Sequence, residues 1–100
     1  MKEPLAYETG RIVRSTQGRD KGKYFIVLEN IGGGYVMMAD GLNHTLEKPK
    51  KKKTKHLYAK PLLEDLMAAR PEGGKLQNSD LRRLLEKNGF AVQRSLCKEG

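Results

Sequence analysis

The chain has 100 residues, of which 37% are hydrophobic and 32% charged, and its net charge is +8. This length allows one small domain with a modest core, and no apolar run approaches the ~20 residues of a membrane-spanning helix. Cys97 is the single cysteine, which excludes a scaffold held together by disulfides. No apolar signal segment follows Met1, so we expect a reducing, cytoplasmic location and no membrane partner.

Short strand patterns separated by turn residues occupy most of the first 60 residues. We expect a lead-in at residues 1–9 and a β domain at residues 10–60, with strands at 11–16, 24–28 and 35–39, where β-branched and aromatic residues cluster. Weaker strand patterns lie at 42–46 and 56–59, after the turn signals Asn30–Gly34 and Asp40-Gly41. Four or five short strands predict a mainly β fold, a small antiparallel barrel.

Residues 61–100 have a helical pattern and are expected to form a C-terminal extension that caps the barrel. Pro61 suits the first position of a helix, and an apolar stripe of leucines and Met67 follows it. Asn78 or Ser79 can cap a second helix, which the Asn88-Gly89 pair would end. Phe90 and Val92 could then pack back on the barrel.

The positive charge is concentrated in two segments. Residues 48–55 read KPKKKKTK, and their six lysines with the preceding Glu47 give a net charge of +5. Residues 10–23 hold five arginines and lysines against Asp20, a net charge of +4. Together they carry +9, so the rest of the chain sums to −1. Such concentrated cations favour a partner of dense negative charge, and nucleic acid is the strongest candidate.

Three other interpretations of the lysine run stay open at this point. It could be a solubilising loop, a nuclear localisation signal or a loop attracted to anionic lipid. The membrane interpretation is the weakest, because no lipidation motif or basic amphipathic helix accompanies the run.

The first basic segment is predicted to form an ordered loop between two strands. Gly18 and Gly22 allow a positive φ, and Asp20 can accept hydrogen bonds from turn amides. Arg19, Lys21 and Lys23 would then be presented on a tight turn together with backbone amides that could grip phosphates. The alternative is a strand–turn–strand that merely needs glycine.

Residues suited to catalysis are few. Cys97 has no neighbouring carboxylate or histidine and is expected to be an incidental thiol, and His44 and His56 are the only imidazoles, so we expect no metal site. His56 adjoins the lysine run and could contact phosphate or be a half-buried strand residue. The Gly22-Lys23 pair fails as a phosphate loop, because its spacing from Gly18 is short and no Ser or Thr follows. We therefore expect neither an enzyme nor a cofactor.

The segment GRIVRSTQGRDKGKYFIV resembles a KOW motif, the nucleic-acid-binding hairpin of an SH3-like barrel. YVMMADG, followed by KPKKKKTKHL, is similar to the bacterial KOW-domain RNA-binding proteins, relatives of the archaeal and eukaryotic large-subunit ribosomal protein fourteen. NSDLRRLL is similar to the helical tail of the bacterial members. The resemblance covers residues 7–59 well and residues 60–90 less closely.

This resemblance implies an SH3-like barrel that binds RNA and associates with ribosomes or translation. Motif by motif, it carries over to the turn residues Gly10, Gly18, Asp20, Gly22, Asp40 and Gly41, to Val13 and Pro49, and to the lysines as far as His56. The longer lysine run and the tail after Phe90 depart from the family pattern.

We predict a non-catalytic RNA-binding module, monomeric when free, that grips phosphates from the KOW-like hairpin and from a mobile lysine loop. The candidate residues are Arg11, Arg14, Arg19, Lys21, Lys23, Lys48, Lys50, Lys51, Lys52, Lys53, Lys55 and His56. The available stacking platforms are Tyr7, Tyr24, Tyr35 and Tyr58, too few for extensive stacking, so we expect recognition of folded RNA by shape. The alternative is a protein-interaction module that docks on a ribosomal or transcription-complex partner.

Overall fold

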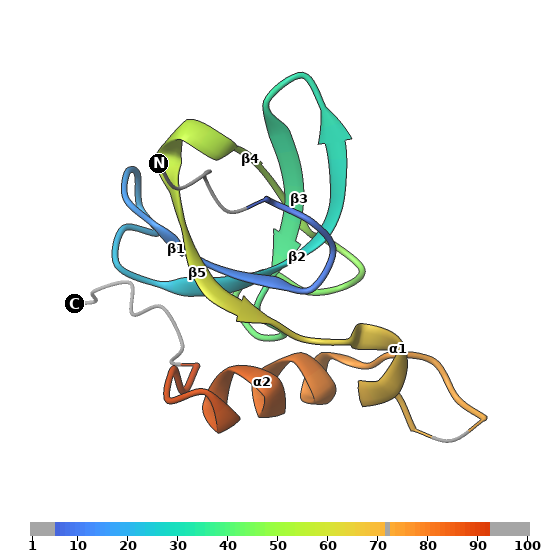
Figure 1. Cartoon of the computed structure of the whole chain (residues 1–100). Helices are drawn as coiled ribbons and strands as arrows, with labels where there is room; N and C mark the ends of the chain where they lie inside the picture. The colour runs from blue at the N-terminus through green and yellow to red at the C-terminus, as the bar shows by residue number, and fades with distance from the viewer. Residues whose placement is uncertain (1–5, 72, 93–100) are drawn as a thin grey trace.

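Five strands form one antiparallel sheet, in the order β4-β3-β2-β1-β5. They are β1 (Arg11–Ser15), β2 (Tyr24–Gly32), β3 (Tyr35–Ala39), β4 (Lys50–Lys53) and β5 (Leu57–Leu63), with a 3-10 turn, η1 (Thr54–His56), before β5. The computed structural model describes residues 6–71 and 73–92, and Figure 1 shows the curled sheet with a helix, α2 (Asn78–Lys87), lying along one side. The mainly β, barrel-like prediction with a helical C-terminal part is confirmed.

The middle of the sheet is buried on both faces, which explains the continuous apolar run of β2. Phe25 and Val27 face the barrel interior, where they pack in one cluster with Val13, Val36 and Met38. Ile26 faces the other way, in register with Ile12 of β1 and Ala39 of β3, and this row packs under α2. Each fully buried large side chain contributes about 1.5–3 kcal/mol.

The helix α2 closes the outer face of this row with Leu81, Leu84 and Leu85. Its N-cap is Gln77, one residue before the predicted cap, because Asn78 turns its side chain to the Leu46 amide instead (2.8 Å). The predicted ending is confirmed: Gly89 follows the helix with a φ of +90°. The predicted packing of Phe90 and Val92 against this cluster is also confirmed.

The predicted strand at residues 42–46 is wrong, and these residues form a loop. The buried Asp40 carboxylate accepts hydrogen bonds from the backbone amides of Leu42, Asn43 and His44, at 2.9 to 3.0 Å. Amides bound to a side chain are not free to pair with a neighbouring strand. Asp40-Gly41 therefore begins a wide loop that ends at β4, and not a two-residue hairpin.

The prediction of a mobile loop for the lysine run is also wrong, because its centre is the strand β4. Lys50–Lys53 pairs with β3 along four residues, Tyr35 to Met38. Lysine has a low intrinsic preference for strands, but a charged edge strand is a common way to prevent unwanted pairing between sheets. Since β4 pairs only with β3, it is such an edge.

Pro61 does not begin a helix. It lies within β5, which continues to Leu63 opposite Arg11, so the helical part begins later than predicted. Proline has no backbone N–H to donate. It is tolerated here because β5 is the other edge of the sheet, where one side of the strand has no neighbouring strand to accept such a hydrogen bond. The short helix α1 (Leu66–Ala69) follows, with the Asp65 side chain as its N-cap.

The glycine turn between β2 and β3 is shorter than predicted. β2 continues through Asn30 to Gly32, so only Gly33 and Gly34 form the turn, both with positive φ. Within the described part of the chain, no helix has the length and apolar character needed to cross a membrane.

Candidate nucleic-acid interface

Backbone hydrogen bonds order the loop between β1 and β2, as predicted. The Gly22 amide donates to the Ser15 carbonyl (2.7 Å), and the Lys23 amide donates to the Asp20 carbonyl (2.9 Å). Gly18 and Gly22 both have a φ of +87°, a conformation that other residues rarely adopt. The loop holds Arg19 and Lys21 in exposed positions and Lys23 half-buried.

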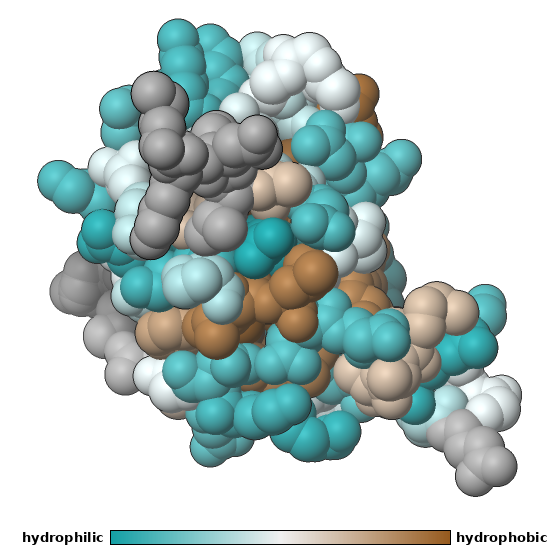
Figure 2. Space-filling model, in the orientation of Figure 1, coloured by the Kyte–Doolittle hydropathy of each residue, from teal (hydrophilic) through white to brown (hydrophobic). Residues whose placement is uncertain are grey.

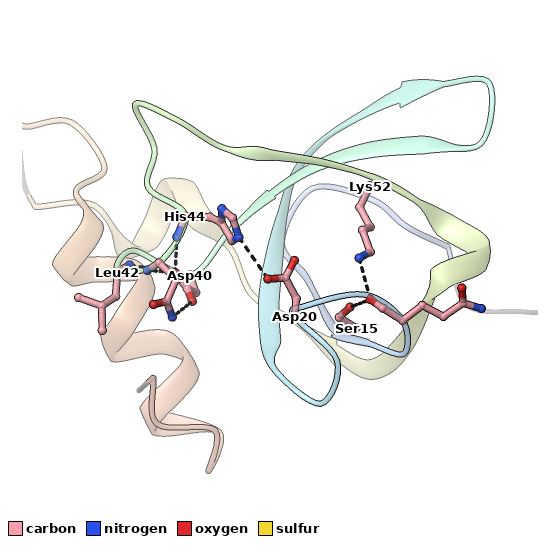
Figure 3. Close-up of polar contacts among 8 residues, drawn as sticks. Ser15, Asp20, Asp40, Leu42, His44 and Lys52 are labelled. Carbon is pink, nitrogen blue, oxygen red and sulfur yellow. Dashed lines mark hydrogen bonds and ion pairs between the residues drawn. The ribbon is translucent and has the colours of Figure 1, made fainter. Parts of the chain in front are cut away.

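The side chain of Asp20 has a different partner from the predicted turn amides. Its carboxylate Oδ1 lies 3.4 Å from Nε2 of His44, in the loop between β3 and β4 (Figure 3). The His44 ring also lies against Phe25, with 5.6 Å between ring centroids. Asp20 therefore connects the β1–β2 loop to the β3–β4 loop, while its backbone carbonyl supports the turn.

The lysines of β4 alternate between the two sides of the strand. Lys50 and Lys52 stand opposite the buried residues Met38 and Val36, so they lie on the side of the barrel interior and are half-buried. Lys51 and Lys53 lie on the outer side and are exposed. Long lysine stems can cover apolar residues while their ammonium groups reach solvent, which suits the partial burial of Lys50 and Lys52.

Lys52 joins the two basic segments of the sequence. Its Nζ donates a hydrogen bond of 2.9 Å to the carbonyl oxygen of Gln17, which is 35 residues away in the chain (Figure 3). A Cβ at Gly18 would lie 3.2 Å from the same nitrogen. The β1–β2 loop and β4 therefore contact each other. We call the cations that they carry, with those next to them in the chain, the basic surface: Arg19, Lys21, Lys23, Lys48, Lys50, Lys51, Lys52, Lys53 and Lys55.

The basic surface is extended by η1. Lys55 is exposed and His56 half-buried. The carbonyl oxygen of His56 accepts hydrogen bonds from the amide and the hydroxyl of Thr16, both at 2.9 Å, which fixes η1 beside the β1–β2 loop. His56 is half-buried as one prediction had it, but it lies in η1 and not in a strand. Its contact with phosphate stays a prediction.

Acidic side chains do not neutralise β4. Among the described residues, the ion pairs join Glu8 to Arg11, Asp20 to His44, Asp80 to Arg83 and Glu64 to Lys87, and no lysine of β4 takes part. Glu47, the nearest acid in sequence, accepts instead from the Asn78 side-chain amide (3.0 Å), a bond that lowers the pKa of its carboxyl. Like charges therefore accumulate on β4.

Arg11 is a correction to the predicted set, because it is only 8% exposed. Its guanidinium donates to the Ala6 carbonyl (2.8 Å) and lies 3.4 Å from both the Lys60 carbonyl and the Glu8 carboxylate. These contacts hold the N-terminal lead-in against β5. We therefore assign Arg11 to the fold and leave it out of the proposed interface.

Arg14 is exposed but lies on the outer face of the sheet, in register with Tyr24 on one side and Tyr58 on the other. Sequence reasoning missed Lys60 and Phe90, which join this group: Lys60 Nζ lies 5.5 Å from the Tyr58 ring centroid and 5.9 Å from that of Phe90. The alternation of Tyr58, Lys60 and Leu62 along β5 is the signal that could have found Lys60, since alternate strand residues share a face.

Most of the predicted stacking platforms are occupied within the protein. Tyr24 stacks on Phe90 with ring centroids 3.9 Å apart, and Lys51 Nζ lies 4.8 Å from the Tyr35 ring centroid. Tyr7 is half-buried and donates to the Leu57 carbonyl, and burial raises the pKa of its hydroxyl. Tyr58 is 53% exposed and is the most accessible of the four.

A separate apolar groove with a volume of about 630 Å³ has no lysine or arginine in its lining. Its lining includes Leu28 of β2, Leu63 at the end of β5 and Met67 of α1, of which Leu63 and Met67 are 50% and 66% exposed. Figure 2 shows hydrophobic residues gathered in the middle of this face of the molecule. Glu64 and Asp65 also line the groove; Glu64 is paired with Lys87, and Asp65 is exposed.

Residues 6–71 and 73–92 contain no group of three or more His, Cys, Asp and Glu side chains placed to hold a metal ion. The predicted incidental thiol, Cys97, lies outside the described residues.

The comparisons with known proteins give no family: no protein-family model matches the chain, and no curated protein matches it significantly.

Proposed function

We propose that the chain is a non-catalytic RNA-binding module that grips RNA phosphates through the basic surface. The observation that carries this proposal is the hydrogen bond from Lys52 to Gln17, because it joins two basic segments that are distant in sequence. The lysines of β4 take part in none of the ion pairs of the described residues. Such a row of like charges is electrostatically unfavourable in isolation, and it becomes favourable when phosphates lie against it.

The mechanism follows from the stiffness of the parts that carry the charges. β4 is hydrogen-bonded to β3, and the β1–β2 loop is closed by its own backbone hydrogen bonds. Cations held at fixed spacing lose less entropy on binding than cations on a mobile chain, so they favour RNA whose phosphates have a matching arrangement. Phosphate contacts read shape and position rather than base sequence, which suits a folded RNA.

The KOW-like motif supports a cytoplasmic role on ribosomal or other structured RNA. In the segment that resembles this motif, Gly10, Gly18 and Gly22 have positive φ, as tight turns require. We propose that the protein associates with the large ribosomal subunit or with another component of translation. Co-sedimentation with large subunits tests this, and loss of the protein after RNase treatment or a high-salt wash is the expected result.

The phosphate grip is tested by titration of a labelled RNA hairpin at several salt concentrations. Lys51→Gln with Lys53→Gln removes two exposed charges from the side of β4 opposite to Lys52, whose ammonium group contacts the β1–β2 loop. Each lost phosphate contact lowers the log–log salt slope by about 0.9 on a duplex, so the double variant should lose nearly two units of slope.

A matched control removes two exposed cations from the helical part that take part in none of these ion pairs, with Arg70→Gln and Lys75→Gln. Its net charge equals that of the β4 variant, so a general charge effect would weaken both proteins equally. We expect the control to keep most of its affinity and slope. Equal losses in both variants would reject the basic surface as the RNA interface.

The apolar groove favours a second candidate function, a protein-interaction module. Its exposed Leu63 and Met67 suit a partner segment that has apolar side chains, and the exposed Asp65 suits a cation beside them. The substitution Met67→Lys would abolish such docking while leaving RNA binding intact. Retention on ribosomal subunits after RNase treatment, with loss in this variant, would support protein docking over RNA contact.

A further inference from the structure

The helix α2 covers only part of the outer face of the sheet. It packs on the row formed by Ile12, Ile26 and Ala39. The next row on the same face, two residues further along β1, consists of Tyr58, Arg14 and Tyr24, which stand opposite one another on β5, β1 and β2. Phe90, which follows α2, stacks on Tyr24 and leaves the Tyr58 end of the row uncovered.

Cations surround the uncovered ring of Tyr58. The Arg14 guanidinium carbon lies 5.9 Å and Lys60 Nζ 5.5 Å from its centroid. Both distances are near the outer limit of a cation–π contact, so these contacts are weak. Because both cations lie on long, flexible side chains, they can turn to a phosphate while another planar group occupies the ring.

The position of Tyr58 along the chain connects it to the basic surface. It lies two residues after His56, near the start of β5, which directly follows η1 with its Lys55. An RNA strand whose phosphates lie along β4 and η1 would therefore reach Tyr58 next. An exposed tyrosine with flanking cations is the combination that single-stranded RNA needs, a stacking surface for a base and charges for its phosphates.

We propose that Tyr58 is a stacking platform for an unpaired base of the bound RNA, with Arg14 and Lys60 contacting the phosphates on either side of that base. This inference rests on the proposed RNA binding and refines it: the preferred ligand is a structured RNA with a single-stranded extension or loop beside the helix. The aromatic face gives affinity for unpaired bases without choosing among them, because every base has a π face.

A purely structural role is the competing explanation. Cross-strand aromatic and cationic neighbours stabilise sheets, and Arg14 is directly opposite Tyr58. The two explanations differ in what they predict for a ligand without bases. A structural role leaves binding insensitive to the presence of a base in the overhang, whereas stacking requires one.

The experiment compares three RNA hairpins with the full chain: one blunt, one with a three-nucleotide single-stranded overhang and one with an abasic overhang of the same length. The expected result is that the overhang strengthens binding about tenfold over the blunt hairpin and that the abasic overhang loses most of this gain. The variant Tyr58→Leu should lose the gain, and Tyr58→Phe should keep it. Tyr35→Leu, which removes another tyrosine from the outer side of β3, is the matched control and should keep it.

Equal affinity of the abasic and normal overhangs for the wild-type protein would overturn the proposal, and this arm needs no variant to fold. The absence of any gain from the overhang, or a gain that persists in a folded Tyr58→Leu protein, would also overturn it. Failure of the proposed phosphate grip would give a different result. In that case, the Lys51→Gln, Lys53→Gln protein would bind the blunt hairpin as tightly as the wild-type protein does.

Discussion

The ammonium group of Lys52 and the carbonyl oxygen of Gln17 form a hydrogen bond of 2.9 Å between β4 and the β1–β2 loop. We predict that Lys52→Met, which keeps an apolar stem and removes the donor, destabilises the protein by about 1 kcal/mol. The loop should also open more often, because it loses a contact to a neighbouring strand. Urea unfolding measures the first effect, and amide hydrogen exchange at Lys21 and Gly22 measures the second.

The control for this prediction is Lys51→Met, the neighbouring lysine on the other side of β4. It also removes one positive charge, but it leaves the hydrogen bond from Lys52 to Gln17 in place. Its loop amides should exchange at the wild-type rate while its RNA affinity falls. Equal exchange rates in the two variants would show that Lys52 does not anchor the loop.

Mutual repulsion on the basic surface predicts an unusual response to salt. Two like charges 4 Å apart in water repel by about 1 kcal/mol, and ~0.1 M salt screens interactions beyond about 10 Å. The free energy of unfolding should therefore rise by about 1 kcal/mol between low salt and 0.3 M NaCl, and thermal or urea denaturation measures it. The free energy of unfolding of the Lys51→Gln, Lys53→Gln protein should rise less with added NaCl. A fall in stability with added NaCl would contradict this account of the surface.

Gly41, like Gly10, is a glycine at which alanine is predicted to be costly. It has a φ of +82°, and a Cβ there would collide with the Asn78 carbonyl at the start of α2. The Gly41 carbonyl also accepts a hydrogen bond from Arg82, so helix and loop are in direct contact. Gly41→Ala should cost well over the roughly 1 kcal/mol of a strained φ, and thermal denaturation would show it.

The control is Gly33→Ala in the β2–β3 turn, where φ is +65° and no other atom lies within 4 Å of the added Cβ. It carries the penalty of the left-handed conformation without the collision. Similar losses in both variants would mean that the approach of α2 to the loop is not tight.

The sequence was most informative where local pattern and tertiary structure agree. β3 has the predicted bounds, and Gly18 and Gly22 have the backbone conformation that their turn needs. The continuous run of β2 was recognisable as a strand because aromatic and β-branched residues are suited to it, although its two-sided burial depends on α2, far along the chain.

The remaining errors come from contacts that no local pattern contains. Lys50–Lys53 is a strand because β3 offers it an edge, and Pro61 is in a strand because it lies at the other edge. The amides after Asp40 are bound by its own carboxylate, which consumes the donors that a strand would need. Within the candidate site, the link from Lys52 to Gln17 spans 35 residues and could only be seen in three dimensions.

Arg11 and Arg14 provide the sharpest test of the division between fold and interface. Both were candidates by charge, but the Arg11 guanidinium is buried against the carbonyls of Ala6 and Lys60, while Arg14 is exposed beside Tyr58. Arg11→Met should lower the free energy of unfolding by about 1–3 kcal/mol, because it leaves these carbonyls without a charged donor.

Arg14→Met should have the opposite profile. Its stability should fall by less than about 1 kcal/mol, since an exposed cation–π contact contributes no more than that. Its affinity for RNA should fall and its salt slope should drop by about 0.7–0.9, as expected for one lost phosphate. Urea unfolding and RNA titration of both variants, under conditions where each is fully folded, measure these differences. An Arg11→Met protein that is stable but binds RNA weakly would return Arg11 to the interface and contradict its assignment to the fold.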